Sequence, residues 1–208
     1  MSLSAADFLA QLSSSGVLPA DEVRELESHY LQEDSAPEVS RLAELLIAAG
    51  TLTRFQADEL TAGRGERLVF GEYVILSPIG AGGMGRVFKA RHRRMDRLAA
   101  IKMLPEETLA SPAAIERFQQ EVRVAARLLH RNIVITHDAS ETRGIHYLVM
   151  EYVDGQDLAT LVRRNGPLAV EDAIITATTT MSLRKMGIPV RWKPATACSK
   201  CTPTATAS

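Results

Sequence analysis

The spacing of apolar residues along the chain changes near residue 70. Before that point apolar positions recur at helical intervals, and a glycine follows the first helical segment of each half. Five positions return at one constant offset, with Leu12, Gly16, Leu18, Glu25 and Leu26 matched by Leu46, Gly50, Leu52, Glu59 and Leu60. The pattern predicts two copies of a helix, a turn and a second helix, which form a small helical bundle over residues 1–65.

From Phe70 the apolar spacing changes to two, which is typical of strands. A helix interrupts the strands, with Ser111 as its cap and Pro112 in its first turn. Its predicted apolar face contains Ile115, Phe118, Val122, Ala125 and Leu129. The predicted strands cover residues 73–79, 86–92, 98–104, 133–139 and 145–152. We therefore expect an α+β fold in which one main helix packs on a five-stranded antiparallel sheet.

A glycine-rich turn joins the first two of these strands. Gly80, Gly82 and Gly85 have no Cβ, so the backbone can come close to phosphate oxygens. A dinucleotide-binding turn has the same spacing, but it opens a helix and requires an acidic residue about 20 positions later. Here the β-favouring Val87 and Phe88 follow. The sequence therefore favours a hairpin that covers a nucleotide triphosphate.

Lys102 lies in the third predicted strand, on the same face as Ala100 because residues two apart share a face. This arrangement places a small side chain beneath a flat base and an ammonium group at the phosphates. Val87 can cover the base from the preceding strand, and Ile79 lies just before the turn. The alternative is a surface lysine on an edge strand.

Glu121 lies on the border of the apolar face of the main helix, one position before Val122. From there its carboxylate can turn inward and hold Lys102 extended toward the phosphates. The alternative is an ordinary helix acid in water.

Residues 70–172 resemble the N-terminal lobe and hinge of a protein kinase, in particular the eukaryotic-like serine/threonine kinases of bacteria. The resemblance rests on ordered motifs at residues 79–87, 100–102, 117–121, 130–134 and 148–155. It implies ATP as the cofactor, with Lys102 on the α and β phosphates and Glu121 as its partner. It also implies a glycine loop over ATP, formed by Gly80, Ala81, Gly82, Gly83, Met84 and Gly85.

The same resemblance implies how adenosine is held. Met150 corresponds to the residue that guards the back of the adenine pocket, Glu151 and Val153 offer backbone groups to adenine, and Asp157 contacts the ribose. In a complete kinase Mg²⁺ accompanies ATP, and the substrate is a protein serine or threonine. Residues 1–65 are similar to extensions of multidomain bacterial kinases, and we expect these helices to be the place for any protein partner.

The chain departs from the family after its hinge. Phosphoryl transfer needs a His-Arg-Asp catalytic loop and an Asp-Phe-Gly metal ligand, and neither motif is present in the 208 residues. Asp172 is the last acidic residue, and residues 174–180 are β-branched and poorly suited to the helix expected there. We hypothesise that a frame change or truncation ends the kinase sequence near Asp172, which would leave a chain that is inactive alone.

Composition adds few constraints. A net charge of -1 gives no argument for nucleic acid as a partner, and the start lacks a secretory signal. No apolar run is long enough to span a membrane, so the sequence predicts a soluble, cytoplasmic protein. Cys198 and Cys201 could suggest zinc, but a structural zinc site usually needs four ligands and residues 173–208 contain no histidine. We predict no metal site and a disordered tail over 173–208.

Three interpretations follow from the sequence. The first is the ATP-binding part of a serine/threonine protein kinase. The second is a pseudokinase-like regulator that binds nucleotide without transferring phosphate. The third is a protein-interaction module whose N-terminal helices bind a partner.

Overall fold

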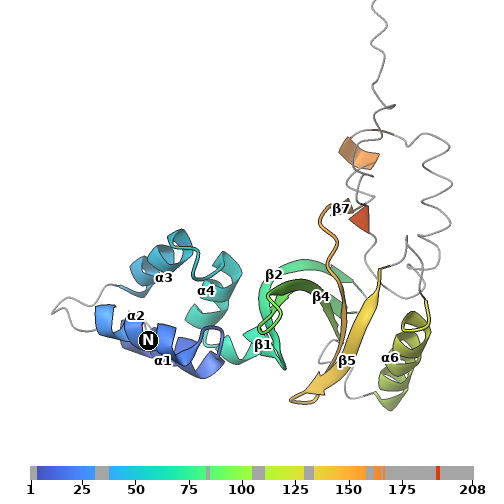
Figure 1. The fold of residues 1–208 in the computed structure, drawn as a ribbon, viewed down its shortest axis with the longest axis horizontal. Coiled ribbons are helices and arrows are strands. Elements are labelled where there is room, and N and C mark those ends of the chain that lie inside the picture. The colour runs from blue at the N-terminus through green and yellow to red at the C-terminus, as the bar shows by residue number, and fades with distance from the viewer. Residues whose placement is uncertain are drawn as a thin grey trace, which may run out of the picture.

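The computed structural model describes residues 4–30, 38–82, 85–104, 111–128, 134–157, 162–164, 166 and 191–192. Four helices come first, as the repeat predicts: α1 (Ala5–Ser15), α2 (Ala20–Tyr30), α3 (Val39–Ala48) and α4 (Arg54–Thr61). A short 3₁₀ helix, η1 (Gly65–Leu68), leads from them into the sheet (Figure 1). We call residues 4–61 the helical extension.

The repeated glycines end the first helix of each pair. Gly16 follows α1 with a φ of 67°, and Gly50 lies in the turn after α3 with a φ of 74°. Glycine adopts this left-handed conformation without steric cost, so each glycine ends one helix and redirects the chain. The matching leucines Leu12 and Leu46 are both buried in the bundle.

The sheet has six antiparallel strands in the order β1-β2-β3-β4-β6-β5. Their bounds are β1 (Val69–Phe70), β2 (Tyr73–Gly82), β3 (Gly85–His92), β4 (Arg97–Met103), β5 (Thr136–Thr142) and β6 (Ile145–Glu151). Five of them are the predicted strands. The count of five was short by β1, because a two-residue strand has no periodicity of its own and is defined only by its pairing with the start of β2.

The main helix, α6 (Pro112–Ala125), begins where the sequence predicts. Ser111 is its N-cap residue and Pro112 is in its first turn, as predicted, although the Ser111 side chain makes no capping hydrogen bond. Phe118 and Ala125 are buried against the sheet, whereas Leu129 lies outside the described residues. In Figure 1, α6 and the helical extension lie on opposite sides of the sheet.

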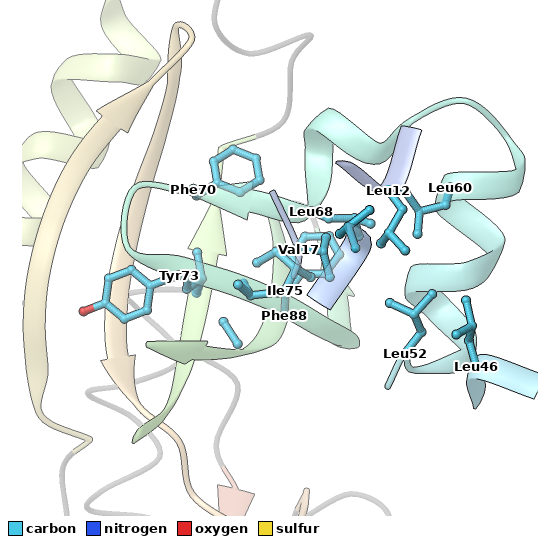
Figure 2. Packing of buried hydrophobic residues seen from close by; sticks show 14 of the residues in the cluster. Leu12, Val17, Leu46, Leu52, Leu60, Leu68, Phe70, Tyr73, Ile75 and Phe88 are labelled. Carbon is cyan, nitrogen blue, oxygen red and sulfur yellow. The ribbon is translucent and has the colours of Figure 1, made fainter. Parts of the chain in front are cut away.

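Both faces of the sheet are therefore covered. Ala99 and Ile101 of β4 belong to a hydrophobic core shared with the helical extension, whereas Ala100 between them belongs to a core shared with α6. Figure 2 shows the first of these cores, with leucines of the helices beside Ile75 and Phe88 of the strands. The helical extension thus packs on the sheet as an additional layer.

Beyond the hinge, β7 (Gln156–Asp157) pairs with β8 (Arg191–Trp192). The structure differs here from the predicted disordered tail, because backbone pairing gives these two tail residues strand conformation. Residues 173–190 and 193–208 lie outside the described part of the chain. Within the described residues, no helix is long and apolar enough to cross a membrane.

Candidate functional site

Lys102 lies in the middle of the sheet. Its strand, β4, runs between β3 and β6, and the register places Lys102 opposite Val87 on one side and Leu148 on the other. The residue is only 2% exposed. The alternative of a surface lysine on an edge strand is therefore wrong. A lysine this deep needs a compensating charge, because burying an ammonium group without a partner is costly.

Glu121 on α6 provides that charge. Its Oε2 lies 3.3 Å from the Lys102 Nζ, and the ammonium donates to the carboxylate. The Glu121 side chain is 30% exposed, so this carboxylate is partly hydrated while its partner is not. The structure thus brings together two residues that the sequence predicted as a pair, and their contact links α6 to the sheet.

The predicted adenine-side residues gather on the same face as Lys102. Val87, Ala100 and Met150 are buried in the core shared with α6, and Ile79 packs against it. Met150 lies opposite Ala100 in the β4–β6 register. Strand alternation explains why Val87, Ala100 and Met150 lie on the α6 side of their strands, whereas Ile79 lies in an irregular part of β2.

The glycine-rich segment forms a tight hairpin. β2 continues to Gly82 and β3 begins at Gly85, so the strands extend into the segment that the sequence predicts as a turn. Gly85 has a φ of 125°, a conformation that other residues rarely adopt. A Cβ on Gly80 would meet nothing within 4 Å, so packing within the described protein does not require glycine there. Ala81 has strand backbone, whereas Gly83 and Met84 lie outside the described residues.

The hinge residues follow β6. The Glu151 N–H donates to the carbonyl of Ile135 at 2.8 Å, so only the Glu151 carbonyl could serve a bound base. Val153 is half-buried in the irregular segment that follows, and the Asp157 backbone is in β7, where it pairs with Arg191.

The residues suit ATP better than they suit a metal ion alone. Lys102 offers a buried cation, the face beside it is apolar, and the space next to Gly80 is open to an approaching phosphate. Among the described residues, no three histidine, cysteine, aspartate or glutamate side chains form a group that could hold a metal ion. The site therefore has the parts for phosphate and base, and the described residues hold no Mg²⁺ cage.

Two residues that the sequence did not connect with this site contact the strand that leads into the glycine-rich hairpin. Thr53 and Gln56 begin α4 with a capping box, and both side chains also donate to main-chain carbonyls of β2. The capping signature, threonine followed three residues later by glutamine, was available in the sequence. The hydrogen bonds of these two side chains to β2 could not be predicted from the sequence, because they depend on contacts with a strand about 20 residues away.

Comparison with known proteins identifies the family of this chain. The family model for the protein kinase domain matches residues 73–183, just over half of the chain and beyond Asp172. The serine/threonine-protein kinase PknE of Mycobacterium tuberculosis (strain ATCC 25177 / H37Ra) is 38% identical over 114 residues, which are 55% of this chain and 20% of that protein. The serine/threonine-protein kinase PrkC of Bacillus subtilis (strain 168) is 41% identical over 106 residues, which are 51% of this chain and 16% of that protein.

Among solved structures, the PknI kinase domain of M. tuberculosis matches with a TM-score of 0.48 and 30% identity, over 57% of this chain and 48% of that one. The chain spans a fifth or less of the length of PknE and PrkC.

Proposed function

The chain belongs to the protein kinase domain family, and we propose that it forms the ATP-binding part of a serine/threonine protein kinase. The observation that carries this proposal is the pair formed by Lys102, 2% exposed, and Glu121, with 3.3 Å between Nζ and Oε2. The carboxylate holds the ammonium extended in the sheet, where it can bind the α and β phosphates of ATP.

The rest of the nucleotide fits around this pair. Ile79, Val87 and Ala100 would contact one side of adenine, and Met150 would close the back of its pocket. Glu151 would accept from the base through its carbonyl, Val153 would supply a further backbone group, and Asp157 would contact the ribose. The residues around Gly80 would cover the phosphates.

We further propose that this chain binds ATP without transferring its γ-phosphate. No His-Arg-Asp or Asp-Phe-Gly motif is present in the sequence, so the catalytic Asp and the family's usual Mg²⁺ ligands are missing. A frame change or truncation in the gene would account for this. Sequencing the gene through codon 172 and beyond tests that explanation, and an uninterrupted frame with no kinase-like continuation in any frame would refute it.

Nucleotide binding is the direct test of the proposed function. A fluorescent ATP analogue with Mg²⁺ should bind the chain and be displaced by ATP, and Lys102→Met should abolish this binding. We expect weak affinity because one lobe provides only half of the contacts around the base. Binding that is unchanged in Lys102→Met would refute the proposed site.

The pseudokinase-like regulator shares this site, and phosphate transfer distinguishes both inactive forms from an active kinase. Incorporation of labelled phosphate into a generic basic protein would contradict the proposal of an inactive chain, whereas binding without turnover fits either inactive form. The interaction module has less support. The large hydrophobic side chains exposed among the described residues are Met95, Leu98, Val124, Ile135 and Val162, and all lie outside the helical extension.

A further inference from the structure

We propose that the helical extension helps to shape the nucleotide site, and that Thr53 and Gln56 are positioning residues for the glycine-rich hairpin. They act by holding an irregularity in β2 from the side opposite Lys102. The predicted effect on nucleotide affinity rests on the proposed function. The predicted effect on the conformation of the hairpin does not.

Strand β2 contains two bulges before the glycines. Its register with β3 shifts between Ile75 and Ser77 and again between Pro78 and Gly80. Leu76 and Ile79 are therefore extra residues, with no Cα partner in β3. A bulge bends its strand and changes the direction in which the following side chains point.

The first bulge decides which face Ile79 occupies. Ile75 and Ile79 are four residues apart, so in a regular strand both would lie on the same face. Instead, Ile75 belongs to the core shared with the helical extension, and Ile79 packs on the core beside Lys102. The extra residue Leu76 accounts for this reversal. Without this extra residue, the side chains between Leu76 and the glycines would point to the opposite faces of the sheet, and Ile79 would point away from the nucleotide.

The start of α4 holds this bulge through two hydrogen bonds. The Thr53 hydroxyl donates to the Leu76 carbonyl at 2.6 Å, and the Gln56 Nε2 donates to the Ile75 carbonyl at 2.7 Å. The same two side chains cap α4, because Gln56 N–H donates to Thr53 Oγ1 at 3.2 Å and Thr53 N–H donates to Gln56 Oε1 at 2.8 Å. Both ends of the Gln56 amide are therefore used.

Burial makes the hydrogen bond from Gln56 difficult to replace. Gln56 is 2% exposed, so water cannot readily replace its amide at the Ile75 carbonyl. A buried carbonyl that loses its donor loses more than a typical net hydrogen bond, because its desolvation is no longer compensated. The pair therefore favours the bulged form of β2 over a regular register, and with it the orientation of the hairpin.

Gln56→Glu separates the two roles of this residue. A glutamate keeps the oxygen that accepts from Thr53 N–H, as in many capping boxes, but an ionised carboxylate cannot donate to the Ile75 carbonyl. We expect the fluorescent ATP analogue to bind about tenfold more weakly to this variant, the size of effect one lost buried hydrogen bond can have. We also expect faster hydrogen exchange at the backbone amides of 77–88 and unchanged exchange in α6.

Ser4→Ala is the matched control. Ser4 and Asp7 form the other complete capping box, at the start of α1, and their side-chain bonds stay within that box. This variant should lower the unfolding temperature while nucleotide affinity and hairpin exchange stay at their wild-type values. An equal effect of Ser4→Ala and Gln56→Glu on affinity would overturn the inference, because general loss of stability would then explain both.

The two measurements keep this inference distinct from the proposed function. If the wild-type chain binds no nucleotide, the proposed function fails, and hydrogen exchange of the hairpin still decides the positioning role. Unchanged exchange and affinity in Gln56→Glu would refute that role. If Gln56→Glu does not fold, Thr53→Ser, which keeps the hydroxyl, is compared with Thr53→Val, which removes it. Faster hairpin exchange in Thr53→Val alone supports the inference, and equal exchange in both contradicts it.

Discussion

Replacing Lys102 should mainly weaken nucleotide binding, whereas replacing its partner Glu121 should mainly lower stability. Lys102→Met removes the cation and puts an apolar side chain of similar length in a buried position. Glu121→Gln keeps the shape of its side chain but leaves the buried ammonium without its carboxylate at 3.3 Å. We therefore expect Lys102→Met to lose nucleotide binding with little loss of stability, and Glu121→Gln to be the less stable variant.

The magnitudes follow from burial and distance. At an effective dielectric constant of about 20, unit charges 3.3 Å apart attract each other by about 5 kcal/mol. The net contribution is smaller because both groups lose hydration and Glu121 remains 30% exposed, so we expect Glu121→Gln to cost about 2 kcal/mol. For a chain of this length that lowers the unfolding temperature by about 4–8 °C. Lys102→Met should stay within about 1 kcal/mol of the wild type, because replacing a buried charge with an apolar group is often neutral.

Thermal unfolding and titration with the fluorescent ATP analogue measure both effects. Lys102→Met should lose detectable binding, because it loses its charged contact with the phosphates and the affinity of the wild type is already weak. Glu121→Gln should bind more weakly as well, but it retains the cation and should lose less. If the two variants unfold at the same temperature, or if Lys102→Met is the less stable, then the pair does not compensate a buried charge and the argument fails.

Three further predictions concern other parts of the molecule. Gly85→Ala should destabilise the chain by about 1–3 kcal/mol in chemical denaturation, because the φ of Gly85 is 125°. Gly80→Ala should weaken nucleotide binding with little effect on stability, because a Cβ there meets nothing within 4 Å. Equal stability losses in the two variants would contradict this prediction. Phe88→Ala removes a buried ring between the helical extension and the sheet and should cost about 3 kcal/mol, and a loss below 1 kcal/mol would show that the extension is not packed there. The hydrogen bond from Arg64 holds the pKa of the Glu59 carboxyl below its ordinary value of 4.5. The ionised Glu59 carboxylate therefore contributes fully to stability above pH 4.5, and this contribution is lost as the pH falls further. The difference in unfolding temperature between wild type and Glu59→Gln should therefore shrink toward zero in acid, and a constant difference would refute the assignment.

Much of the fold was predictable because it depends on local patterns. The offset between Gly16 and Gly50 predicted two helix pairs, and the period-two spacing after Phe70 predicted the five main strands. The bounds of those strands shifted by up to three residues. The short β1 and the β7–β8 pairing were missed, because such strands are defined by their partners and carry no periodicity.

The candidate site was predictable to the extent that its residues share a strand or form a motif. Ala100 and Lys102 lie on one face because covalent geometry alternates side chains along any strand. The position of Glu121 at the border of the helix face predicted its pairing with Lys102, the family resemblance agreed, and the structure supports that pairing with a contact distance. Alternation, however, gives the wrong face for Ile79 relative to Ile75, because it assumes a strand without bulges.

The sequence by itself determined the helices, the main strands, the order of the motifs and the absence of the two catalytic motifs, since each of these is a property of neighbouring residues. Only the tertiary structure decided that Lys102 is buried in a central strand, that the helical extension covers the back of the sheet, and that Thr53 and Gln56 hold the bulge in β2. These features depend on which distant segments pack together. That choice is made by the combined burial of many side chains, which no local pattern records.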